Sequence, residues 1–180
     1  MRRDARRLYC EPLEPRLVLA GDLCITEFMA SNNGTSIDSF GESSDWIELY
    51  NPTGNPVDLA GWTITDDPAD PTKFTFLSGH TIPPTGYLIV WADDDVSQNL
   101  PGVHTNFKLS ADGEDLILVD SDGETVLQSV FFGAQRSDVS WGRIPDAADG
   151  GTPVIWQLMV PTPNATNDDN APPFIQELTQ

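Results

Sequence analysis

The chain has 180 residues, of which 39% are hydrophobic, so it is long enough for one domain with a real core and polar ends. Its 28 acidic and 9 basic residues give a formal net charge of −19, which repels nucleic-acid phosphates and attracts divalent cations or basic surfaces. No stretch approaches the roughly 18 apolar residues of a membrane span, and no Cys/His cluster has the spacing of a zinc site.

The first 21 residues have the outline of an export segment. Arginines crowd the start, and Leu17 to Ala20 form a short apolar run that ends in small residues. We therefore expect residues 1–21 to be removed and the protein to be extracellular or in the cell envelope. The alternative is a disordered basic tail on a cytoplasmic protein. Cys10 lies in this segment, so a disulfide with Cys24, which we expect to be a buried strand residue, is not expected.

Short strands separated by Gly, Pro, Asn and Asp turns dominate the rest of the chain. The predicted strands cover residues 23–29, 45–50, 62–65, 73–77, 87–92, 115–119, 125–132 and 140–144, with 30–44 and 93–103 as exposed loops. Asp122 and Gly123 suit a hairpin turn, because such turns need positive φ angles. From Val160 onward, Pro, Asn, Thr and Asp indicate a linker or tail.

Alternation within the strands predicts which side chains are buried. Between residues 45 and 51, Ile47 and Leu49 point to one side, and Trp46, Glu48 and Tyr50 to the other. Residues 87–92 are apolar throughout and predict a central strand that is buried on both faces.

The number and spacing of these strands predict the fold class. Eight or nine short antiparallel strands indicate an all-β, immunoglobulin-like β-sandwich over residues 22–163, followed by a disordered tail or linker over 164–180. We expect Ile47, Ile64 and Ile89 to meet in its interior.

Several motifs in order resemble a lamin-tail domain of the bacterial secreted type. They lie at residues 25–32, 45–51, 59–62, 86–92, 104–110 and 140–143, so the resemblance covers about residues 23–163. The family implies an immunoglobulin-like sandwich, in agreement with the strand pattern. Leu13-Glu14-Pro15-Arg16 also resembles an N-terminal segment that certain bacteria carry on exported proteins.

The resemblance implies a non-catalytic extracellular module that presents loops to a protein or cell-surface partner. The alternative is a calcium- or glycan-binding accessory domain of a secreted or surface enzyme system. Filament formation, which the family serves in nuclear lamins, does not carry over, because no heptad rod is present. The oligomeric state, and whether the chain is a fragment of a larger protein, stay open.

Calcium is the one cofactor that the residues suggest. Asp93, Asp94 and Asp95 follow a predicted strand, and Ca²⁺ takes oxygen ligands from flexible loops. Further carboxylates cluster before residue 46 (Asp38, Glu42, Asp45) and after residue 65 (Asp66, Asp67, Asp70). None has EF-hand spacing, and the alternative is that all are solvated turn residues. No nucleophile elbow of the Gly-x-Ser-x-Gly kind accompanies His80 or His104. We therefore expect that the protein is not an enzyme and has no catalytic residue.

The remaining residues of interest are structural. They are Trp46, Ile47, Glu48, Leu49, Trp62, Trp91 and Arg143. Glu48 and Arg143 are charged within apolar strands, and we hypothesise that they pair or share a hydrogen-bond network between strands; the alternative is that each faces water. Trp62 and Trp91 are expected in the core, whereas Trp156 is the best candidate for an exposed carbohydrate platform.

Overall fold

The computed structural model describes residues 23–99, 102–147 and 153–167. These residues form strands and one short 3₁₀ turn. The elements are β1 (Cys24–Met29), β2 (Asp45–Tyr50), β3 (Val57–Asp58), β4 (Thr63–Thr65), β5 (Phe74–Thr75), β6 (Thr81–Ile82), β7 (Tyr87–Ala92), η1 (Val96–Gln98), β8 (Val103–His104), β9 (Glu114–Val119), β10 (Val126–Phe132), β11 (Ser140–Ile144) and β12 (Ile155–Met159). None of the described helical segments is long and apolar enough to cross a membrane.

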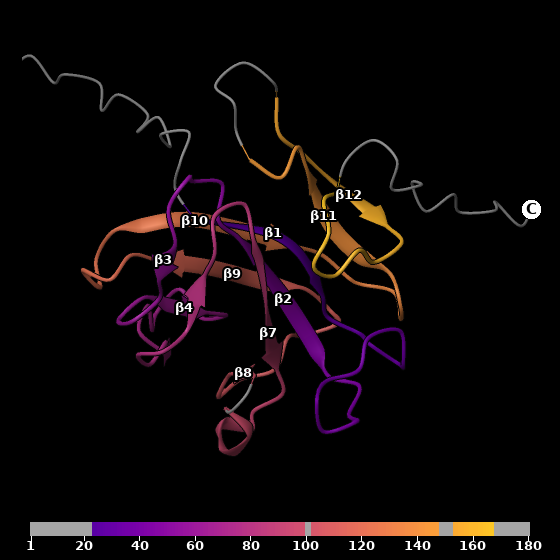
Figure 1. The fold of residues 1–180 in the computed structure, drawn as a ribbon. Coiled ribbons are helices and arrows are strands. Elements are labelled where there is room, and N and C mark those ends of the chain that lie inside the picture. Colours follow the sequence, from indigo (N-terminus) through magenta and orange to yellow (C-terminus); the bar gives the residue numbers. More distant parts are fainter. Residues whose placement is uncertain (1–22, 100–101, 148–152, 168–180) are drawn as a thin grey trace, which may run out of the picture.

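The strands build a two-layer sandwich (Figure 1). One sheet has the order β12-β11-β1-β2-β7-β8, the other has the order β10-β9-β4-β5, and β3 and β6 form a separate pair. The predicted all-β, immunoglobulin-like fold is confirmed. Two details differ: β7 and β8 run parallel, and the described residues contain twelve strands rather than eight or nine. The additional strands include two-residue pairings such as β3 and β6, which sequence alternation is too short to mark.

Apolar side chains from both sheets meet in one core. Ile25, Phe28 and Ile47 come from the larger sheet, and Ile64 and Phe132 from the smaller one. The ring centroids of Phe28 and Phe132 are 4.7 Å apart. The two sheets therefore share one core, and the prediction that Ile47 and Ile64 meet in it is confirmed.

The prediction for Ile89 is wrong. Ile89 lies opposite Glu48 on β2, and it belongs to the opposite face from Ile47, which pairs with Val90. Because cross-strand partners share a face, Val90 and not Ile89 enters the core. Most side chains of β7 are only half-buried, so the expectation that this strand is buried on both faces is also wrong.

The tryptophans divide differently from the prediction. Trp46 is fully buried, and Trp62 is half-buried against the core. Trp91 lies outside the core and stacks near His104, with ring centroids 6.5 Å apart. Trp156, the candidate for exposure, packs on Phe28 at 5.6 Å because β12 adds an outer strand beside β11. Trp156 is therefore not an exposed platform for a sugar ring.

The packed body of the molecule continues past residue 163. Asn167 is fully buried, and its side chain donates to the carbonyl of Thr26 at 2.8 Å. The N–H of Asn164 donates to Glu48 at 2.5 Å. Residues 160–167, which we call the C-terminal strap, thus cover the outer face of β1 and β2. Residues 1–22 and 168–180, with the predicted export segment, Cys10 and most of the predicted tail, lie outside the described residues.

Candidate functional site

Two loops meet at one end of the sandwich, below β2, β7 and β8 in Figure 1. The first loop, residues 30–44, connects β1 and β2, and the second, residues 93–98, follows β7 and contains η1. Asn32 folds the first loop back on itself: its side chain donates to the carbonyls of Ser36 at 2.6 Å and Ser44 at 2.8 Å. The loop is therefore an ordered element, although its sequence of Ser, Asn, Gly and Asp predicted only an exposed connection.

Asp38 is held in a tight turn within this loop. Its Oδ1 accepts the N–H groups of Phe40 at 2.8 Å and Glu42 at 2.9 Å, as a turn-forming aspartate does. Gly41 has a φ of 88°, a conformation that favours glycine. Asp38 is 9% exposed, and its buried Oδ2 has no hydrogen-bond partner among the described residues.

His104 is the second member of the site, and its side chain is fully buried on β8. Its Nδ1 lies 2.6 Å from Oδ2 of Asp93, which follows β7 directly, and its backbone N–H donates to Asn99. Nε2 is buried and has no partner within the described part of the chain. A Cβ on Gly102 would lie 2.9 Å from that nitrogen, so glycine leaves the ring its space.

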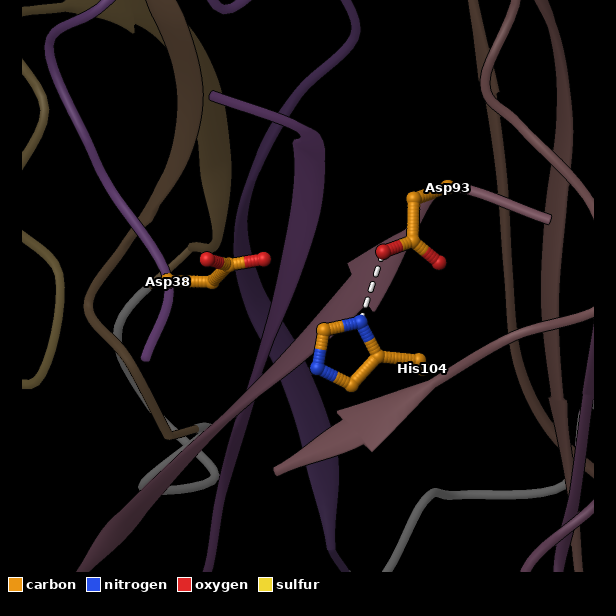
Figure 2. A group of neighbouring side chains, drawn as sticks. All are labelled: Asp38, Asp93 and His104. Atoms are coloured by element: carbon orange, nitrogen blue, oxygen red, sulfur yellow. Dashed lines mark hydrogen bonds and ion pairs between the residues drawn. The ribbon is translucent and has the colours of Figure 1, made fainter. Parts of the chain in front are cut away.

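The three side chains converge from three segments. Figure 2 shows the imidazole between the carboxylates, with Asp93 at Nδ1, Asp38 facing Cε1, and Nε2 directed away from both. One ligand atom from each of Asp38, Asp93 and His104 lies within 4.8 Å of the others. Within the described residues no hydroxyl or thiol hydrogen-bonds to the ring. The arrangement therefore joins one imidazole to two acidic side chains, with no nucleophile beside the ring among the described residues.

The predicted calcium residues do not converge on one point. Of Asp93, Asp94 and Asp95, only Asp93 joins the cluster, and so does Asp38, one of the further carboxylates considered for calcium. Asp94 is exposed with a φ of 60°, and Asp95 caps η1 by accepting from the N–H of Ser97 at 3.1 Å. Hydrogen bonds from the Ser97 side chain, and secondarily from its backbone, hold the pKa of Asp95 below its ordinary value. Successive residues of this segment thus point in different directions.

The partners of Asp93 were not predicted from the sequence. Asp38 was considered for calcium with Glu42 and Asp45 and not with Asp93, and His104 was considered only as a residue without a nucleophile. The parallel pairing of Trp91 with His104 brings His104 beside the end of β7. No local sequence pattern predicts a parallel pairing, because the paired strands are separated by a long connection.

Exposed apolar side chains occur in the segments that carry this cluster. Ile37 is 59% exposed, Phe40 51% and Val96 51%. The ring of Phe40 lies 5.9 Å from that of His104. Residues 36–42 and 93–98 together with His104 form what we call the loop end.

One side chain ties the two segments of the loop end together. Gln98 of η1 donates to Glu42 at 3.0 Å and to Asp95 at 3.1 Å. The β1–β2 loop and η1 are therefore in direct contact.

A second polar cluster lies under the C-terminal strap and involves Glu27 and Glu48. Glu48 accepts from the hydroxyl of Thr26 at 2.8 Å as well as from Asn164, whereas Arg143 has neither an ion pair nor a hydrogen bond with it. The hypothesis of a Glu48–Arg143 network is therefore wrong. Backbone and hydroxyl donors satisfy the carboxylate instead.

Comparison with known proteins gives one result. A family model described as Lamin Tail Domain matches residues 19–133, more than half of the chain. The match contains β1 to β10, whereas β11, β12 and the C-terminal strap lie beyond it. The family model is thus shorter than the resemblance to residue 163 that the motifs suggested. No curated protein matches the chain.

Proposed function

The chain belongs to the lamin tail domain family, and from that premise we propose that it is a non-catalytic interaction module whose loop end binds a protein or cell-surface partner. The family consists of immunoglobulin-like modules that generally serve interaction. Such modules present binding groups on loops that a rigid sandwich positions. The proposal places the binding function at the end of the sandwich where the β1–β2 loop meets η1.

The single observation that carries this proposal is that Ile37, Phe40 and Val96 are exposed on two acidic segments that a hydrogen bond from Gln98 to Glu42 joins. Each has more than half of its surface in water. Apolar side chains at the centre of a patch, with charged groups around them, are the composition of protein-binding surfaces.

The charges around the patch indicate the chemistry of the partner. Glu42, Asp94 and Asp95 belong to the same two segments as the apolar side chains, and the chain as a whole carries a net charge of −19. A complementary partner has apolar groups flanked by lysine or arginine. A nucleic-acid partner is disfavoured, because its phosphates would be repelled.

The proposed location is outside the cytoplasm, at the cell surface or in the medium. Its support is the basic, then apolar sequence of residues 1–21. Intact-mass analysis of the protein recovered from its native cells tests it. The expected result is a chain that lacks about the first 21 residues in the extracellular or envelope fraction, and an intact N-terminus in the cytosol would contradict it.

Capture of partners from a native cell-surface fraction tests the interaction. We expect the double variant Ile37→Ser/Phe40→Ser to lose a partner that the wild type retains. The matched control is Leu77→Ser/Phe131→Ser, which changes apolar side chains that are 67% and 75% exposed elsewhere on the sandwich. Equal capture by all three proteins would refute the loop end as the binding surface.

A further inference from the structure

We propose that the C-terminal strap is a detachable flap that Glu27, Glu48 and Asp146 hold in place, and that it opens as the pH rises while the sandwich stays folded. The inference goes beyond the proposed interaction function and does not depend on it. Opening would uncover the outer face of β1 and β2, which the strap covers when it is closed.

The strap adds little to the hydrophobic core. None of residues 160–167 belongs to the core cluster or packs against it. Val160 is 49% exposed, and residues 163–166 are exposed as well. Segments with few buried apolar contacts open locally at a lower free energy than core strands do. The strap can therefore open without separation of the two sheets.

Three carboxylates hold the strap through its backbone N–H groups. The donors, acceptors and distances are Thr162 to Glu27 at 3.1 Å, Asn164 to Glu48 at 2.5 Å and Asn167 to Asp146 at 3.0 Å. The hydroxyl of Thr162 also donates to Glu27, at 3.0 Å. The position of the strap is therefore linked to the charge state of these acids.

No basic side chain forms an ion pair with these three acids in the part of the chain that the structure describes. The ion pairs there are Lys73 with Asp66 and His104 with Asp93. Arg143 of β11 lies opposite Trp156, which packs against the core, so it belongs to the other face of the sheet. The strap itself has no titratable side chain. Ionisation of the glutamates is therefore uncompensated.

The other titratable groups around the strap do not change this direction. They are Cys24 on β1, Tyr50 on β2 and Tyr87 on β7. Burial raises the pKa of Tyr50. Burial, and then the hydrogen bond to Asp146, raises the pKa of Tyr87. Both tyrosines therefore stay neutral in the pH range where the glutamates titrate.

The sign of the effect follows from proton binding. Burial raises the pKa of Glu27, and it raises the pKa of Glu48 to about 8, whereas an open strap returns both to water, where the ordinary value is 4.5. Between these values the closed form binds more protons than the open form, so a rising pH favours opening. Closure is strongest below pH 4.5 and is lost as the pH rises through about 8.

The test is amide hydrogen exchange of the whole chain, followed by NMR at several pH values between 5 and 8. Each rate is divided by that of an unstructured peptide at the same pH, which removes the intrinsic pH dependence of exchange. We expect the protection of the Thr162, Asn164 and Asn167 amides to fall by up to about tenfold per pH unit for each carboxyl that ionises. The amides of β2 and β9 should keep a higher protection at every pH.

This wild-type measurement decides the matter without a variant. Strap amides as protected as those of β2 and β9 would show that the strap opens only when the whole sandwich unfolds. Strap amides that are unprotected at pH 5, or whose protection does not change with pH, would also overturn the proposal.

The variant Glu27→Gln/Glu48→Gln tests the acids directly. It removes both titrating groups, while each glutamine oxygen can still accept the N–H groups of the strap. We expect the protection of the strap to become nearly independent of pH. The matched control Asp112→Asn/Glu124→Gln neutralises two exposed carboxylates and should keep the slope of the wild type. Equal slopes in the two double variants would refute a role of the glutamates, and would leave the interaction function, which the Ile37/Phe40 variant tests, unaffected.

Discussion

Glu27 on β1 and Glu48 on β2 lie directly opposite each other, and both are fully buried. Two buried carboxylates cannot both ionise cheaply, because each loses its hydration and repels the other. Burial raises the pKa of Glu27, and it raises the pKa of Glu48 to about 8. Hydrogen bonds from Ser140 and Thr162 to Glu27, and from Thr26 and Asn164 to Glu48, lower these pKa values but less than burial raises them.

The raised pKa of Glu48 predicts that stability decreases as the pH rises from about 4.5 to about 8. In this window the folded protein binds more protons than the unfolded chain, so deprotonation favours unfolding. One such group lowers the free energy of unfolding by at most about 1.4 kcal/mol per pH unit. Glu48→Gln keeps a neutral side chain at all pH values and should flatten this dependence. Urea unfolding at several pH values between 5 and 8 measures it.

The control for this prediction is Glu124→Gln, which neutralises an exposed carboxylate. It should retain the slope of the wild type. A slope in Glu48→Gln that equals those of the wild type and the control would show that Glu48 does not titrate in this range.

Asn167 is predicted to hold the C-terminal strap onto β1. Its side chain donates to the carbonyl of Thr26 and accepts from the hydroxyl of Thr162 at 2.6 Å. Asn167→Ala removes this donor from the carbonyl of the fully buried Thr26, which should cost about 1–3 kcal/mol of unfolding free energy. Thermal or urea unfolding measures the loss, and Asn55→Ala, at an exposed turn position, should change stability by less than about 0.5 kcal/mol. Equal effects of the two substitutions would contradict a structural role for the strap.

Substitution of Gly142 on β11 by any residue with a side chain is predicted to destabilise the protein. A Cβ there would overlap the sulfur of Met159 and approach Asn167 to 3.2 Å. Met159 has a flexible side chain, but Asn167 is fixed by its hydrogen bonds, so Gly142→Ala should destabilise the protein by about 1–3 kcal/mol. The control is Gly133→Ala, where a Cβ meets nothing within 4 Å. Melting temperatures of the two variants decide the matter: a lower value for Gly133→Ala than for Gly142→Ala would refute the packing argument.

Asn51 is predicted to tolerate no carboxylate. Its amide nitrogen donates to the carbonyls of Asn55, Ile82 and Pro83 at 2.8, 3.0 and 3.0 Å, and the residue is fully buried. Asn51→Asp replaces this donor with an acceptor and buries a charge against three carbonyl oxygens, at an expected cost of about 3 kcal/mol or more. Chemical unfolding measures the cost.

The same change at an exposed neighbour controls for added negative charge. Asn55→Asp should differ from the wild type by less than about 0.5 kcal/mol. If the buried and exposed substitutions destabilised the protein equally, the hydrogen bonds of Asn51 would not be the cause.

The longer strands were predictable because their alternation is strong. Ile47 and Leu49 identify the face of β2 that packs in the core. Asp122 and Gly123 identify the turn between β9 and β10. β12 was missed, since Ile155 to Met159 has no alternation that separates it from the polar segment around it. The face of Ile89 was also misassigned, because an all-apolar strand does not reveal which of its residues pair with Ile47.

The sites depended on contacts that sequence does not encode locally. Glu48 was given the wrong partner, because Asn164 contributes a backbone N–H that any residue except proline could supply. Asp93 was identified as a candidate ligand, but its neighbours Asp94 and Asp95 were grouped with it by adjacency. The backbone bends at Asp94, whose φ is 60°, so these neighbours diverge, whereas Asp38 and His104 come from other segments.

The pairing of β11 with β1 has a practical consequence for anyone who trims this protein to its family match. A fragment that stops at residue 133 would strip β1 of its neighbour and leave a row of bare amides and carbonyls along a strand whose residues are all buried in the intact molecule. An exposed strand edge of this kind favours backbone pairing between copies of the fragment. Aggregation of that shortened protein would therefore report a missing neighbour and not an unstable fold.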